Sequence, residues 1–72
     1  MNEIRHIRKT LFAVSQSDFA AILGVAQSTV SRWEGGVAPS LEEMRAIRSA
    51  AFEREIVWND SYFFQTPKEA AE

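Results

Sequence analysis

Apolar residues recur along the chain at spacings of three and four, which is the pattern of helices that bury one face. The first such stretch places Ile4, Ile7 and Leu11 on one side and predicts a helix over residues 2–11. Residues 12–14 are then expected to form a connector.

Two further helices are predicted on either side of a glycine. Ser15 precedes the first of them, over residues 16–23, and a serine hydroxyl in this position accepts from free N–H groups of the first turn. Gly24 ends that helix, because glycine enters the left-handed conformation without steric cost. The next helix is expected over residues 27–34.

The helix over residues 27–34 has two contrasting faces. Val30 and Trp33, three residues apart, form its inner side, and two glycines follow its last residue. Its outer side is polar and consists of Gln27, Ser28, Ser31 and Arg32.

A fourth helix begins after Ser40, which forms an S-x-x-E capping box with Glu43. Its end is ambiguous in the sequence: the helix either runs on to Val57 or breaks near Phe52 and restarts. The expected inner face of this helix contains Leu41, Met44, Ile47 and Ala51.

The C-terminal part of the chain is less regular. Residues 59–61 are typical of a turn, and residues 62–64 favour either a short strand or a final helical turn. Residues 67–72 are predicted to be a frayed tail. The fold class is therefore all-α, with four or five helices in one domain over residues 1–66.

Composition excludes several kinds of protein. The chain has 72 residues, no cysteine and a single histidine, His6, so we expect no disulfide, no cysteine-ligated metal and no cofactor. No apolar run approaches the ~20 residues of a membrane helix, and no signal peptide is evident, so we expect a cytoplasmic protein. No set of nucleophile, base and acid points to an enzyme.

Charge is unevenly distributed along the chain. The net charge is −2, which is unusual for a protein that binds phosphate. Residues 1–36 nevertheless carry four basic and three acidic side chains, whereas residues 37–72 carry four basic and seven acidic ones. The polar helix face lies in the basic half, and the acidic half is expected to face a partner or solvent.

The stretch SQSDFAAILGVAQSTVSRWEGG, residues 15–36, resembles the helix-turn-helix of the phage repressor and Cro type, also called XRE-like. The resemblance extends from about Ile4 to Ile47 and implies a compact lambda-repressor-like domain that binds double-stranded DNA. The matching positions are Ser15-Gln16, Phe19-Ala20, Gly24-Val25, Gln27, Val30-Ser31, Trp33-Glu34 and Gly36.

The resemblance implies roles for individual residues. Gln27, Ser28 and Arg32 are expected to contact bases, since glutamine and arginine can pair with adenine and guanine in the major groove. Contacts to the DNA backbone are expected from Gln16, Thr29, Ser31, Gly35, Gly36, Arg5 and Lys9.

Other positions of the motif are expected to be structural. Ala20 allows two helices to cross closely, Gly24 allows the turn, and Val30 and Trp33 anchor the third helix from beneath. In this family an arginine late in the first helix pairs with a glutamate that closes the third.

Arg8 and Glu34 are the matching pair in this sequence. The segment before Ser15 is one residue longer than usual. A second departure from the family pattern is Ala26, where many relatives carry a serine or threonine that caps the third helix.

Two questions stay open at the level of sequence. Composition alone favours interpreting the polar face of residues 27–34 as an ordinary solvated surface, whereas the complete motif favours DNA contact. Within residues 52–66, the aromatic side chains either pack on the monomer's own core or form a homodimer interface. These side chains are Trp58, Tyr62, Phe63 and Phe64.

The sequence is thus interpreted as a transcriptional regulator, a repressor that binds an operator as a homodimer on the nucleoid of a bacterial or phage-infected cell. The alternative is an antitoxin, or another protein-binding module, that reuses the same fold to bind a toxin or a different regulator. The acidic, aromatic C-terminal half motivates this alternative.

Overall fold

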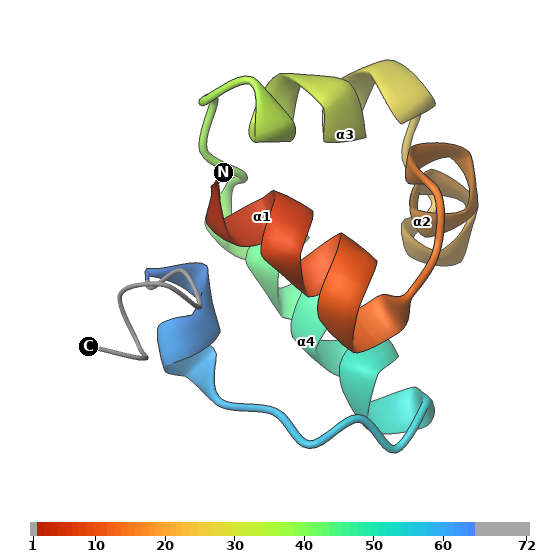
Figure 1. The fold of residues 1–72 in the computed structure, drawn as a ribbon, viewed down its shortest axis with the longest axis vertical. Helices are drawn as coiled ribbons and strands as arrows, with labels where there is room; N and C mark the ends of the chain where they lie inside the picture. Colours follow the sequence, from red (N-terminus) through yellow and green to blue (C-terminus); the bar gives the residue numbers. More distant parts are fainter. Residues whose placement is uncertain (1, 65–72) are drawn as a thin grey trace.

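The computed structural model describes residues 2–64, and all regular structure in that range is helical (Figure 1). Residues 65–72, including the predicted tail, lie outside the described residues. The elements in chain order are α1 (Glu3–His6), the π-helix η1 (Ile7–Phe12), α2 (Gln16–Leu23), α3 (Gln27–Glu34), α4 (Leu41–Glu53) and the 3₁₀ helix η2 (Asp60–Phe63).

The all-α prediction is confirmed, and the bounds predicted for α2 and α3 are those of the structure. α4 ends at Glu53, so the helix breaks near Phe52 and does not continue to Val57. The aromatic run after it closes a helical turn and does not form a strand, since Tyr62 and Phe63 are the last residues of η2. Asn59 starts that turn by accepting a hydrogen bond from the Ser61 amide at 2.9 Å.

The core forms where α1 crosses α4 and where α2 and α3 close over them (Figure 1). Phe12, expected in the connector, is instead buried, and its ring meets that of Phe19 edge to face with centroids 4.9 Å apart. Leu41 was expected to face inward, but it is 63% exposed because it opens α4 beyond the edge of the core. The buried apolar residues are Ile4, Ile7, Phe12, Phe19, Ala20, Val30, Trp33, Ile47, Ala50 and Ala51.

The part of the chain where the resemblance predicts an extra residue before Ser15 contains a wider helical turn. α1 passes directly into η1, where the wider π turn holds one more residue than an α turn. η1 ends at Ala13, which adopts the left-handed conformation with φ 57° and ψ 46°. The amides of Ala13 and Val14 both donate to the Arg8 carbonyl, so this end is closed by backbone hydrogen bonds.

An ion pair fastens this first helical segment to the end of α3. Arg8 Nε and Nη2 donate to the two carboxylate oxygens of Glu34 at 2.5 and 3.1 Å, and Nη1 donates to the Val14 carbonyl at 2.9 Å. Only 11% of the Arg8 side chain and 8% of the Glu34 side chain are exposed. The pairing expected for Arg8 and Glu34 is therefore present and is bidentate.

A second bond supports the same junction. Asn2 accepts from the Arg5 amide and so caps α1, while its Nδ2 donates to the Trp33 carbonyl at 2.6 Å. The N-terminus of α1 and the C-terminus of α3 are thus joined by a side chain to which the sequence pattern assigned no role.

The environment of Glu34 favours the charged carboxylate. Burial alone raises its pKa, but the hydrogen bonds from Arg8 and Gln16 and the positive charges of Arg8 and Arg5 outweigh burial. The pKa of Glu34 therefore lies below its ordinary value of 4.5. The ion pair consequently stabilises the fold above that pH, and this contribution is lost as pH falls through the lowered pKa.

Replacing Ala13 by glycine should stabilise the protein by about 0.5–1 kcal/mol, because a left-handed alanine costs ~1–2 kcal/mol and glycine offsets part of that gain through unfolded-state entropy. Urea denaturation at neutral pH measures the change. The matched control is Ala21→Gly in the exposed middle of α2, which should lose about 1 kcal/mol. A loss of stability in both variants would contradict the conformational argument.

The Glu34→Gln variant should be less stable than the wild type near neutral pH, because its uncharged amide loses the ion pair with a nearly buried Arg8. The difference in stability between the two proteins should decrease as pH falls from about 5 toward 3, because the wild-type carboxylate becomes protonated. Denaturation midpoints across that range test this. Parallel curves for the two proteins would show that Glu34 does not carry the pH dependence.

Candidate nucleic-acid interface

α2 and α3 are joined by a tight turn, which backbone hydrogen bonds and a left-handed glycine stabilise. Ser15 Oγ accepts from the Asp18 amide at 3.1 Å and starts α2, as its sequence position predicts. Gly24 ends α2 in the left-handed conformation, with φ 72°. The amides of Gly24 and Val25 donate to carbonyls of the last turn of α2. Only two residues, Val25 and Ala26, therefore separate Gly24 from the start of α3.

The inner faces of α2 and α3 fix the angle between them. Ala20, which has a small side chain, is 3% exposed in α2. Val30 is fully buried and Trp33 is nearly so, which anchors α3 on the core from one side. These positions match the structural roles that the motif implies for them.

The opposite face of α3 is free. Gln27, Ser28, Ser31 and Arg32 are exposed, whereas Thr29 is half-buried. Within residues 2–64, none of the exposed four forms a side-chain hydrogen bond with the rest of the protein. Their donors and acceptors are therefore available to an external ligand, and the helix that carries them lies along one edge of the molecule (Figure 1).

The N-terminus of α3 lacks the side-chain cap that a serine or threonine would provide, as the sequence predicts. Ala26 occupies the N-cap position and makes no side-chain hydrogen bond. The amides of the first turn of α3 therefore lack a side-chain acceptor at the end of the helix where the backbone dipole is positive.

Gln16, which was expected to contact phosphate, also forms a hydrogen bond within the protein. Its Nε2 donates to Glu34 Oε1 at 3.2 Å, so the first residue of α2 joins the Arg8–Glu34 pair. The side chain is half-buried, and its amide nitrogen has a second N–H group. Three segments of the chain thus meet at the Glu34 carboxylate, an arrangement that sequence spacing did not reveal.

The positive side chains of the first helical segment have different surroundings. Arg5 and Lys9 are both exposed. The positive charge of Arg5 makes the smallest contribution to the lowered pKa of the Glu34 carboxyl group. Among the described residues, the Lys9 side chain forms no hydrogen bond and no ion pair.

The expectation that Gly35 and Gly36 offer bare N–H groups to phosphate is wrong. The Gly35 amide donates to the carbonyls of Ser31 and Arg32, and the Gly36 amide donates to that of Trp33. These amides cap the C-terminus of α3, where the helix dipole is negative and disfavours an anion. Their role in the structure is to end the helix.

The C-terminal aromatic side chains mostly pack on the monomer itself. Trp58, Tyr62 and Phe63 are half-buried against the core, and Trp58 meets the other two rings edge to face at 5.3 and 5.2 Å. Phe64 differs, since it is 69% exposed.

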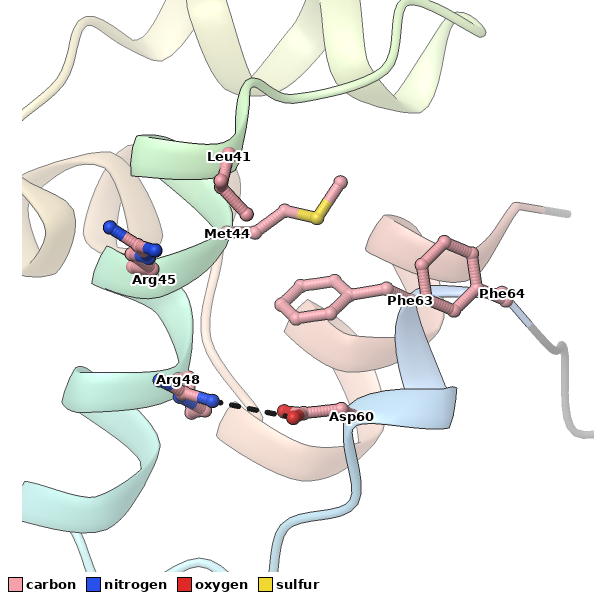
Figure 2. A pocket seen from close by; sticks show the side chains of 7 residues that line it. All are labelled: Leu41, Met44, Arg45, Arg48, Asp60, Phe63 and Phe64. Carbon is pink, nitrogen blue, oxygen red and sulfur yellow. Dashed lines mark hydrogen bonds and ion pairs between the residues drawn. The ribbon is translucent and has the colours of Figure 1, made fainter.

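A cluster of exposed polar side chains attaches this C-terminal segment to α4. Asp60 accepts from Trp58 Nε1 at 2.9 Å. It also accepts from Arg48 Nη1 at 3.3 Å (Figure 2). The sequence pattern gave no signal for this Arg48–Asp60 contact, because it joins α4 to a segment whose structure was ambiguous.

Residues 2–64 contain no helix that is both long and apolar enough to cross a membrane. In the same range no three histidine or acidic side chains gather closely enough to hold a metal ion.

Comparison with known proteins identifies the family to which this arrangement of helices belongs. The helix-turn-helix family model matches residues 4–52, which is more than half of the chain and includes all of α2 and α3. Neither a curated protein nor a solved structure gave a match. The matched region contains the glycine turn, the buried anchors of α3 and its free polar face. The chain therefore belongs to the helix-turn-helix family of DNA-binding regulators of the Cro/C1, XRE-like type.

Proposed function

We propose that this protein is a sequence-specific transcriptional repressor that binds its operator as a homodimer. The observation that carries this proposal is the contrast between the two faces of α3. Val30 and Trp33 are buried and hold one face on the core, while the exposed polar side chains of the other face make no side-chain hydrogen bond within residues 2–64. A rigid helix with a free polar face fits the major groove of DNA.

The proposed base contacts come from Gln27, Ser28 and Arg32. Gln27 is the first residue of α3, where the side chains of such a helix reach base edges, and its amide can pair with adenine N6 and N7. Arg32 lies further along the exposed face and can bond guanine O6 and N7 with two N–H groups. Ser28 offers one hydroxyl beside Gln27.

The proposed backbone contacts surround this face. The second N–H of Gln16, the hydroxyls of Thr29 and Ser31, and the charges of Arg5 and Lys9 can each meet a phosphate. Gln16 is the best supported of these, because its bond to Glu34 holds the amide at the start of α2.

The proposed mechanism is occupancy. A homodimer reads two half-sites about one helical turn apart, and its presence blocks polymerase or a competing regulator. The protein would act in the cytoplasm, on chromosomal or phage DNA.

Replacing Gln27 and Arg32 together by alanine should leave the fold intact, since both side chains are exposed, and should abolish preference for the operator. Two lost bidentate contacts correspond to about 2–6 kcal/mol of discrimination. The operator is first obtained by selecting bound sequences from random duplex DNA. Competition between the selected and a scrambled duplex then measures the preference.

The matched control is Arg54→Ala, which removes another exposed arginine, at the C-cap of α4, and should keep the preference. If the double variant still favours the selected sequence, α3 does not read the bases through these residues.

Removing single charges should distinguish residues that contact the DNA backbone from residues that contact the bases. Arg5→Ala should weaken binding to all duplexes alike and reduce the slope of log affinity against log salt by about one phosphate contact. Arg32→Ala should change the preferred sequence instead. Titrations from about 50 to 200 mM salt distinguish the two, and an unchanged slope in Arg5→Ala would remove Arg5 from the interface.

A second candidate function, a protein-binding module such as an antitoxin, is favoured by one observation. Phe52 and Val57, at the C-terminal end of α4 and beyond it, are 60% and 85% exposed on the acidic half of the chain. A stoichiometric protein partner recovered by pull-down, together with no DNA mobility shift at low salt, would favour this function over the repressor.

A further inference from the structure

We propose that Asn2 is a positioning residue, which holds the C-terminal end of α3 in the direction that lets Arg32 reach its base pair. Asn2 has no proposed contact with DNA. It acts through the backbone of Trp33, the residue that follows Arg32 in the chain. This role rests on the proposed function, since it explains what aligns one of the proposed base-contacting residues.

The side chain of Asn2 bonds the ends of two different helices. Its Oδ1 accepts from the Arg5 amide at 2.9 Å and so caps the N-terminus of α1. Its Nδ2 donates to the Trp33 carbonyl at 2.6 Å, across 31 positions of the sequence. Figure 1 shows the start of α1 beside the end of α3 and the loop that follows it. Because one planar amide provides both the acceptor and the donor, the two bonds together fix one helix end relative to the other.

The Trp33 carbonyl needs such a donor because of its place in α3. It is one of the last four carbonyls of the helix, which have no partner within the helix itself. It accepts from the Gly36 amide at 3.1 Å and from Asn2, so both of its lone pairs are used. The bond from Asn2 is partly buried, which reduces competition from water.

Asn2 reaches the backbone of α3, whereas the other side chains bonded to this end of the helix reach only a side chain. Arg8 and Gln16 both donate to the Glu34 carboxylate, which can rotate about its own bonds. Within residues 2–64, the bond from Asn2 is the one hydrogen bond that joins a side chain outside α3 to the α3 backbone. Asn2 therefore constrains the direction of the last turn most directly.

This constraint acts on Arg32 more than on Gln27. Arg32 directly precedes Trp33, whereas Gln27 opens α3 about 9 Å away along the helix axis. Groups that bind a ligand keep their full effect only when they are held within about 0.5 Å of the productive geometry. A small tilt of the last turn thus misplaces the Arg32 guanidinium, while the fully buried Val30 still holds the middle of the helix and the turn that carries Gln27.

Two substitutions separate the two bonds of Asn2. Asn2→Asp keeps the shape of the side chain and the cap on α1, but a carboxylate has no donor for the Trp33 carbonyl. Asn2→Ser keeps a neutral cap, and its single oxygen on a shorter side chain does not extend to both partners. The matched control is Ser40→Ala, which removes a helix cap of the same kind from α4 and leaves the bonds of α3 intact.

Hydrogen exchange in the absence of DNA tests the hold on α3. The Gly36 amide closes α3, and the Val25 amide closes α2. In both Asn2 variants the Gly36 amide should exchange about fivefold faster relative to Val25 than in the wild type, as the loss of one hydrogen bond implies. Ser40→Ala should leave this ratio unchanged, because a general loss of stability affects both amides alike.

Affinities for single-base variants of the selected operator test the alignment of Arg32. Arg32→Ala and Gln27→Ala first identify the base pair that each residue reads. In both Asn2 variants, discrimination at the Arg32 base pair should fall about tenfold, and discrimination at the Gln27 base pair should stay within about twofold of the wild type. The added charge of Asn2→Asp weakens all duplexes alike and cancels from these ratios. Ser40→Ala should keep both ratios.

An unchanged exchange ratio, or unchanged discrimination at the Arg32 base pair, would overturn the role of Asn2 and leave the proposed function standing. An equal loss at both base pairs would overturn it too, because that result indicates a general loosening of the fold. Circular dichroism checks folding, and Asn2→Ser alone decides if Asn2→Asp does not fold. A wild type without preference for any duplex rejects the proposed function and the alignment of Arg32 with it, whereas the exchange ratio still decides whether Asn2 holds α3.

Discussion

The nearly buried ion pair between Arg8 and Glu34 is the interaction on which the geometry of this small domain depends. It joins the first helical segment to the last residue of α3, and Gln16 connects the start of α2 to the same carboxylate. A charge removed from water is costly unless it is fully bonded, and here both carboxylate oxygens have donors. The position of α3 is therefore set from its C-terminal end as well as by the anchors beneath it.

Local signals in the sequence were sufficient for much of this fold. The bounds of α2 and α3 followed from Ser15 and Gly24, because a serine cap and a left-handed glycine act on their own neighbouring amides. The capping box of Ser40 and Glu43 is present for the same reason, with bonds of 2.7 and 3.1 Å. The ion pair of Arg8 was predictable only through the family pattern, since its partner is 26 residues away.

The errors arose from features that the spacing of residue types does not encode. Leu41 fits the apolar period of α4, but periodicity does not reveal where the core ends along a helix axis. Gly35 and Gly36 were expected to offer free amides, whereas the closing turns of α3 use both. The π turn could not be foreseen, because nothing in Ile7–Phe12 differs in composition from an ordinary α-helix.

The π turn has a consequence for how this chain tolerates changes in length. A π turn holds an additional residue at nearly the same axial rise, so it stores an insertion without moving the elements on either side. We expect removal of one residue between Lys9 and Phe12 to return this segment to α-helical pairing, with Ile4 and Phe19 still in their places. By this expectation, η1 is where the domain tolerates a change of one residue in length while the end of α3 stays attached to Arg8.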